Sequence, residues 1–200
     1  MKSPRTVDDV MTGAAISVDT GAQFKDIVET MREWRISALP VLSADGRVAG
    51  VVSEADLLLK AQGMDESRAV TAGQLMTVPA VTVTKDATIA GAARLMARGH
   101  LKRLPVVDGD NHLVGIVSRG DLLKIYLRPD EDIGAELREL LTAYLLPTGS
   151  AEVYVHVANG IVYLRGTVPD SATRDMVVRV ARTVPGVVDV TATLDVGVSG

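Results

Sequence analysis

An internal repeat at a fixed offset of 65 residues constrains this chain more than any other feature. Residues 6–60 align with residues 71–125 without a gap, and 17 of the 55 aligned pairs are identical. The identities cluster in three blocks: Met-Thr near the start of each copy, Leu-Pro-Val in the middle, and Gly-x-Val-Ser-x-x-Asp-Leu-Leu at the end. Clustering at one register marks two copies of one structural unit, so the first 126 residues should fold as a pair.

Each copy has the same order of expected elements. Apolar residues at helical spacing predict helices over residues 22–33 and 87–98. A short apolar strand, a turn containing Asp45-Gly46 or Asp108-Gly109, a second strand and a closing helix follow in each copy. A unit this short exposes one face of its sheet when it is alone, so we expect the two copies to pair and bury that face.

The three blocks resemble the cystathionine β-synthase (CBS) domain, and two of them in tandem resemble a Bateman module. The resemblance covers residues 7–61 and 71–126, with a connector near Gln62–Arg68. It implies an α+β fold in which two β-α-β-β-α units form a pseudo-two-fold sandwich with two clefts. Such pairs commonly bind adenosine-containing ligands and associate into discs, so we expect a homodimer that forms through the helices 22–33 and 87–98.

Residues 127–200 do not repeat the unit. Apolar residues three and four positions apart predict a helix over residues 131–146, which residues 147–150 end. The alternating pattern on both sides of Asn159-Gly160 predicts a β-hairpin, because Asn-Gly favours a two-residue hairpin turn. A second helix over residues 171–184, with Met176 facing inward, and a final strand complete the order.

This order of helix, strand, strand, helix and strand resembles a BON domain over residues 130–196. The Asn159-Gly160 turn, the Leu-Arg-Gly-Thr-Val stretch at 164–168 and the Gly-Val-Val-Asp-Val stretch at 186–190 carry the resemblance. It implies a small αββαβ domain that attaches to phospholipid or to a partner protein.

Charge is distributed unevenly along a chain whose net charge is −4. Counting Lys and Arg against Asp and Glu gives −3 for residues 1–65, +3 for residues 66–126 and −4 for residues 127–200. Only the middle segment would attract an anion by its own field. The acidic last segment argues against a purely electrostatic partner such as nucleic acid or anionic lipid, so we expect no nucleic-acid partner.

Several classes of protein are disfavoured by what the sequence lacks. The chain has no cysteine, and His100, His112 and His156 have no ligand-like spacing, so we expect no metal site. None of the GxSxG, HExxH, GxGxxG or P-loop motifs occurs, so we expect no catalysis. The sequence has neither an apolar run of 18 residues nor the apolar region of a signal peptide, which predicts a cytoplasmic protein.

The repeated Ser-x-x-Asp sequence is the most informative for function. Ser53 with Asp56, and Ser118 with Asp121, have the spacing of a helix capping box, and this structural role alone could explain them. A helix N-terminus also offers free N–H groups to an anion, and a neighbouring carboxylate can accept hydrogen bonds from ribose hydroxyls. The CBS resemblance implies that both aspartates bind ribose and that both serines lie near ribose or phosphate.

Further candidate ligand-binding residues follow the Met-Thr block or belong to the Leu-Pro-Val block. Backbone groups could contact adenine, and apolar side chains could wall its slot, with core packing as the alternative for the leucine. The adenine candidates are Ala15, Ile16, Leu39, Pro40, Ala80, Val81 and Pro105.

Phosphate needs cations, and four of them lie in the second copy, in the two blocks that should flank its cleft. These are His100, Lys102, Arg103 and Arg119, which align with Arg35, Ser37, Ala38 and Glu54 in the first copy. We therefore expect Asp121 to share a cleft with the four cations, and that cleft to bind phosphorylated ligands better than the cleft of Asp56.

Together these patterns predict a non-catalytic regulatory protein. Its CBS pair would sense an adenine nucleotide (AMP, ADP, ATP or a related adenosyl ligand) and relay the binding to the BON domain. The alternative is a scaffold or stress-associated protein, in which the CBS pair only dimerises and the BON domain attaches to a membrane or to a partner.

Overall fold

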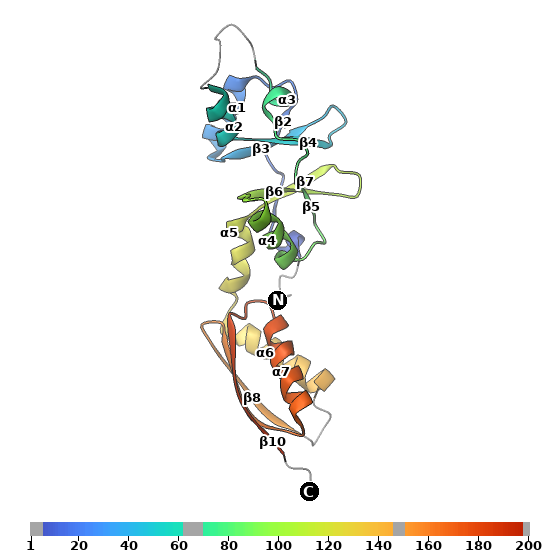
Figure 1. Cartoon of the computed structure of the whole chain (residues 1–200), viewed down its shortest axis with the longest axis vertical. Helices are drawn as coiled ribbons and strands as arrows, with labels where there is room; N and C mark the ends of the chain where they lie inside the picture. Colours follow the sequence, from blue (N-terminus) through green and yellow to red (C-terminus); the bar gives the residue numbers. More distant parts are fainter. Residues whose placement is uncertain (1–5, 62–69, 146–150, 198–200) are drawn as a thin grey trace. The chain divides into compact units, whose positions relative to one another are not determined.

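The computed structural model describes residues 6–61, 70–145 and 151–197 (Figure 1). The chain divides into two compact units, one formed by Arg5–Leu122 and the other containing Leu123–Gly200. The connector expected at 62–68 and the turn expected at 147–150 lie outside the described residues.

Both copies of the repeat have the β-α-β-β-α order that the sequence predicts. The first copy contains β2 (Val18–Asp19), α1 (Phe24–Trp34), β3 (Ala38–Leu42), β4 (Val48–Ser53) and α2 (Glu54–Ala61). The second copy contains β5 (Val83–Thr84), α4 (Ile89–Arg98), β6 (Arg103–Val107), β7 (Leu113–Ser118) and α5 (Arg119–Leu123). The segments that precede them contain a 3-10 turn η1 (Val7–Asp9), β1 (Thr12–Gly13) and α3 (Ala72–Leu75).

Two facing sheets form the centre of the CBS unit, in the orders β2-β3-β4 and β1-β7-β6-β5. In Figure 1, α1 and α2 lie on the outer side of the first sheet, and α4 lies on the outer side of the second. Because helices cover one face and the opposite sheet covers the other, the middle strands are buried on both faces. In β3, for example, all four consecutive residues from Ala38 to Val41 are buried, although their side chains alternate between the two faces. The pseudo-two-fold sandwich is therefore confirmed.

The segment that begins each copy crosses to the sheet of the other copy. Thr12 of β1 pairs with Ile116 of β7, and Thr77 forms an antiparallel bridge with Val51 of β4. Adding the offset of 65 to Thr12 and Val51 gives Thr77 and Ile116, so the backbone pairing itself follows the repeat. The sequence did not predict this exchange, because a repeat does not say which copy a segment joins.

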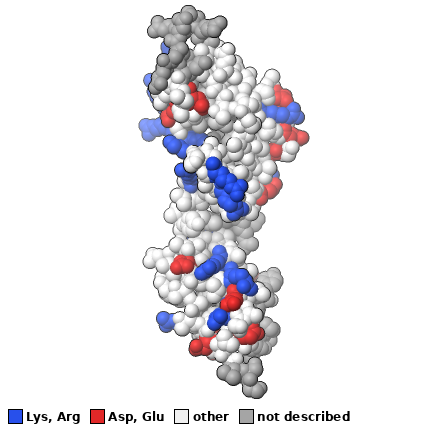
Figure 2. Space-filling view, in the orientation of Figure 1, with Lys and Arg blue, Asp and Glu red and all other residues white. Residues whose placement is uncertain are grey.

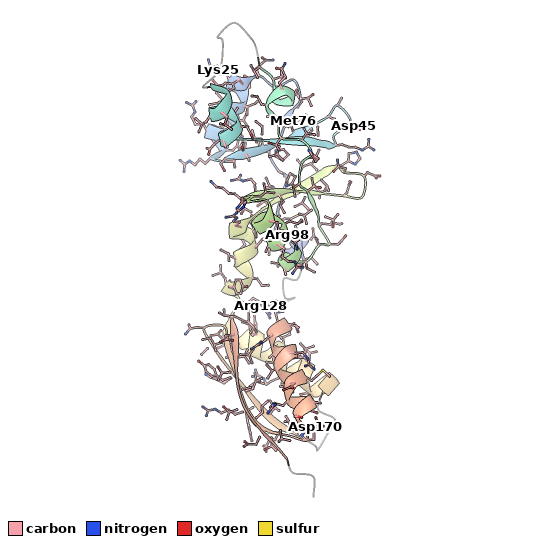
Figure 3. All side chains as sticks on the ribbon, in the orientation of Figure 1. Lys25, Asp45, Met76, Arg98, Arg128 and Asp170 are labelled. Carbon is pink, nitrogen blue, oxygen red and sulfur yellow. The ribbon has the colours of Figure 1, made fainter. Side chains whose placement is uncertain are left out.

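Two glycines make room for the exchanged segments. A Cβ at Gly50 would lie 2.6 Å from Sδ of Met76, whose side chain lies beside β4 (Figure 3). At Gly115, the position aligned with Gly50, a Cβ would lie 2.8 Å from the backbone oxygen of Thr12. These contacts explain why Gly begins the third block of both copies: a side chain there would push the crossing segment away from the strand.

The second unit has the αββαβ order expected of a BON domain. It contains a 3-10 turn η2 (Lys124–Leu127), α6 (Asp130–Leu140), a π-helical turn η3 (Leu141–Leu145), β8 (Glu152–Ala158), β9 (Ile161–Val168), α7 (Ser171–Thr183) and β10 (Asp189–Val196). β9 pairs antiparallel with β8 and parallel with β10, and Figure 1 shows α6 and α7 on one face of this sheet. The confirmed order places the hairpin where the sequence expects it.

Asn159 and Gly160 both have positive φ, at 53° and 73°, as a two-residue hairpin turn requires. The Asp130 carboxylate accepts hydrogen bonds from both of their N–H groups, at 2.7 and 2.8 Å. The start of α6 is therefore tied directly to the β8–β9 turn.

The core of this unit lies between the two helices and the sheet. Ile133, Leu137, Leu164 and Val177 are at most 1% exposed. Met176 is 44% exposed, so its expected inward orientation is wrong. The 3.6-residue period of α7 turns Val177 toward the sheet, and the preceding residue then lies outside the buried stripe.

The helix expected over residues 131–146 is also corrected, because α-helical geometry ends at Leu140 and a π-helical turn follows. No helix in the described parts of the chain combines the length and the apolar character that crossing a membrane requires.

Candidate functional site

A cavity of about 310 Å³ in the CBS unit brings together both copies of the repeat. The first copy contributes the start of β3 and the β4–α2 junction, and the second contributes its exchanged segment and the start of β6. The lining residues are Ser37, Ala38, Val51, Ser53, Glu54, Ala55, Asp56, Thr77, Pro79, Ala80, Val81, His100, Leu101, Lys102, Arg103 and Pro105.

A capping box at the start of α2 fixes the Asp56 carboxylate on the cavity wall. Oδ2 of Asp56 accepts hydrogen bonds from the backbone N–H of Ser53 at 2.8 Å and from its hydroxyl at 2.6 Å. The Asp56 N–H in turn donates to the Ser53 hydroxyl at 3.3 Å. The other carboxylate oxygen, Oδ1, has a 3.4 Å contact with the Thr77 hydroxyl. The cap thus holds one oxygen firmly and leaves the other weakly bound, able to accept stronger hydrogen bonds.

Ser118 and Asp121 form the same capping box in the second copy. The Ser118 N–H and hydroxyl donate to Oδ2 of Asp121 at 2.9 and 2.6 Å, and the Asp121 N–H donates back at 3.2 Å. The two Ser-x-x-Asp sequences are therefore true caps, as their spacing predicts. Any difference in function between them comes from the residues around them.

Basic side chains reach the cavity from the second copy: Lys102 and Arg103 are cations, and His100 lies beside them. One guanidinium nitrogen of Arg103, Nη2, donates to the Ser37 hydroxyl at 3.1 Å. Nε of Arg103 is buried and has no hydrogen-bond partner among the residues that the structure describes. A buried N–H without an acceptor is costly, so Arg103 combines a place on the cavity wall with an unmet hydrogen-bonding capacity.

The structure corrects the expected grouping of these cations with Asp121. His100, Lys102 and Arg103 instead line the cavity that holds Asp56. The physical reason is the packing of the two sheets, which brings the start of β6 to the first-copy residue Ser37. Charge counted along the chain therefore assigned the cations to the wrong cap.

Arg119 is the fourth expected cation, and it is not among the residues that line this cavity. Its Nε donates to the Leu101 backbone oxygen at 2.8 Å. The aligned first-copy residue, Glu54, does line the cavity. At this aligned position the first copy has an acidic residue and the second copy a basic one, and the acidic residue is the one on the cavity wall.

The other candidates fall into two groups. Ala80, Val81 and Pro105 line the cavity, as expected of an adenine slot, although Leu39 is fully buried in the core. Ala15, Ile16, Arg35, Pro40, Ser118 and Asp121 do not line it; the offset of 65 relates them to cavity residues.

Sequence reasoning missed Glu54 and Thr77 as wall residues. The sequence showed that Thr77 belongs to a repeated Met-Thr block. It did not show that this segment crosses to the sheet of the first copy, where Thr77 lies next to Asp56.

Both signs of charge occur on the face of the chain visible in Figure 2. In the described part of the chain, no group of three or more His, Cys, Asp or Glu side chains is arranged to hold a metal ion.

The facing sheets, the exchanged segments and the paired caps define a tandem CBS-domain fold. Comparison with known families agrees: the CBS domain matches residues 7–63 and 72–128, and the BON domain matches residues 129–197. The chain therefore belongs to the CBS-domain family and has a BON domain after the pair.

The relatives that match this chain share its CBS region. Hypoxic response protein 1 of Mycobacterium tuberculosis is 31% identical over 121 residues, which are 60% of this chain and 83% of that protein. The structure of Arabidopsis thaliana CBSX2 in complex with AMP is 32% identical, with a TM-score of 0.56, over 61% of this chain and 96% of that one.

Other relatives are longer. The chain is 30% identical to homoserine O-acetyltransferase of Methanocorpusculum labreanum over 116 residues, which are 58% of this chain and 23% of that protein. The match to that enzyme therefore covers less than a quarter of its length.

Proposed function

We propose that this is a non-catalytic regulatory protein whose CBS pair binds an adenine nucleotide in the cavity next to Asp56. The observation that carries the proposal is the presence in one cavity of a capped carboxylate, the two cations Lys102 and Arg103, and the imidazole of His100. A nucleotide needs both, because ribose offers two hydroxyl donors and phosphate is an anion. CBSX2, 32% identical in sequence, was solved with AMP, and this likeness also supports an adenine nucleotide as the ligand.

Each part of the nucleotide has a matching part of the wall. Ala80, Val81 and Pro105 offer an apolar slot for adenine. Oδ1 of Asp56 would accept hydrogen bonds from the ribose hydroxyls, and Arg103 would donate its unpartnered Nε–H to the phosphate. The repeat implies a second cleft, related to the Asp56 cavity by the offset of 65 residues. We assign to this second cleft the remaining candidates: Ser118, Asp121, Ala15, Ile16, Arg35, Pro40 and Arg119.

We further propose that ligand binding is relayed to the BON domain through residues 124–128. Asp121 lies in α5, which η2 follows directly along the chain. Next comes Arg128, which donates to the Pro185 backbone oxygen and forms a 3.0 Å ion pair with Glu136 of α6. Both side chains of this pair are at most 15% exposed, so the chain is anchored there. A ligand that binds one arrangement of the two CBS domains more tightly would raise the population of that arrangement. The conformation of residues 124–128 would then shift with it.

A homodimer of CBS pairs fits the exposed apolar side chains of the helices. Trp34 is 55% exposed, so it does not belong to the core, and Val28 and Leu95 are 39% and 36% exposed. Burial of such side chains stabilises a dimer. Sedimentation at micromolar concentration should show two chains per particle, and a monomer would contradict this assembly.

The second candidate function is a scaffold in which the CBS pair only dimerises and the BON domain attaches to a membrane or to a protein. The observation that favours it is the exposure of Leu58 and Leu59 on α2, at 66% and 73%. These side chains suit a protein contact and have no part in nucleotide binding.

A thermal screen of the full chain separates the two functions. A ligand at 100 times its dissociation constant stabilises the folded state by about 2.7 kcal/mol, so AMP, ADP or ATP should raise the Tm of the CBS transition by several degrees. S-adenosylmethionine and NADH belong in the same screen. A Tm that none of these ligands changes would contradict the nucleotide sensor and favour the scaffold.

A further inference from the structure

Lysine and arginine on the cavity wall are balanced by acidic side chains. Lys102 and Arg103 contribute two positive charges, and Glu54 and Asp56 contribute two negative charges. The Asp56 carboxylate already accepts two hydrogen bonds from Ser53. Glu54, which takes no part in this cap, is the second acidic group that a ligand anion would meet together with the cations.

No residue in the described part of the chain neutralises Glu54. Its backbone N–H donates to the Ser37 oxygen at 3.1 Å, and its side chain is exposed, with no ion pair or hydrogen bond to Lys102 or Arg103. The guanidinium of Arg103 turns instead to the Ser37 hydroxyl. Glu54 therefore lies on the cavity wall without a basic partner among the described residues.

We propose that Glu54 sets the phosphate preference of the cavity and makes it select a nucleoside monophosphate over the triphosphate. Two cations suffice for one phosphate group, whereas the β- and γ-phosphates add negative charge that Glu54 repels. The preference rests on the proposed nucleotide binding and names the ligand class of the same cavity. Adenosine carries no phosphate, so its affinity should not depend on Glu54.

The repeat itself contains the reversed charge. Arg119 aligns with Glu54, directly after the capping serine in each copy. The two equivalent helix starts therefore carry opposite charges, and only the acidic residue, Glu54, lines the cavity.

Calorimetric titration of the full chain with adenosine, AMP and ATP tests the proposal. The wild type should bind AMP more tightly than ATP. Glu54→Gln removes one negative charge from the wall of a partly hydrated site, so ATP should bind about fivefold tighter. AMP should change by no more than about twofold, and adenosine should not change. Glu29→Gln, an exposed acidic residue of α1 outside the cavity, is the matched control and should change none of the three.

The outcomes separate this inference from the function on which it rests. A wild type that binds neither AMP nor ATP overturns both. If AMP binds but Glu54→Gln leaves the ratio of AMP to ATP affinity unchanged, the nucleotide site stands and the role of Glu54 is wrong. A gain that is equal for adenosine, AMP and ATP would also contradict it, because only the phosphates respond to charge. A gain for ATP that disappears in high salt supports it.

Discussion

Replacing Asp56 with Ala should weaken AMP binding by about 100-fold. The change removes the carboxylate that would accept both ribose hydroxyls, and each charge-assisted hydrogen bond contributes about 1.5–3 kcal/mol. It also removes the acceptor for the N–H and the hydroxyl of Ser53 in the capping box. This loss should cost about 1 kcal/mol of stability at the start of α2. Calorimetric titration with AMP measures the affinity, and the Tm without ligand reports the lost cap.

Asp121→Ala is the matched control, because it removes a capping box of nearly the same geometry from the other copy. Its Tm should fall by a similar amount. AMP should still bind at the Asp56 cavity with little change, because His100, Lys102 and Arg103 line that cavity. This order of effects reverses the one that the charge distribution along the sequence predicts. Equal losses of affinity in the two variants would show that the caps serve equivalent sites.

Gly166→Ala should unfold the BON domain and leave nucleotide binding intact. A Cβ at Gly166 would lie 1.9 Å from the Glu152 backbone oxygen, and the φ of +131° is one that side chains rarely allow. A backbone clash between β8 and β9 should cost more than about 4 kcal/mol, close to the whole stability of a domain of about 70 residues. Scanning calorimetry should show one transition lost, while AMP still raises the Tm of the other.

Gly197→Ala is the control for this change, since its Cβ would meet only ordinary contacts, 3.7 and 3.9 Å away. That variant should keep both transitions. If Gly166→Ala abolished AMP binding while Gly197→Ala retained it, the two units would depend on each other for folding. The division between a nucleotide-binding pair and a separate BON domain would then be wrong.

The repeat and the hairpin signal predicted the order of the elements, and the resemblance to CBS and BON domains supplied their arrangement in space. Seventeen identities at one offset specify two like units, and Asn159-Gly160 places the β8–β9 turn, because both depend on local sequence. The exchange of the starting segments could not be predicted. Thr77 pairs with Val51 through backbone groups, which any residue provides, so no side-chain pattern records the partner strand.

The candidate site also has a part that the sequence predicts and a part that it does not. The two caps could be predicted, since Ser53 and Asp56 are three residues apart and interact within one helix turn. The wall around the Asp56 cap depends on the packing of two sheets, which brings Arg103 to Ser37 across 66 residues. Chain position is a poor guide to such contacts, and for this reason the cations were grouped with Asp121.

The position of AMP in a crystal structure of the full chain with this ligand tests the central claim most directly. We expect the ribose hydroxyls within hydrogen-bond distance of Asp56 and the phosphate next to Arg103, with adenine between Val81 and Pro105. AMP bound outside this cavity, or with its ribose at Asp121 alone, would contradict the assignment of the site.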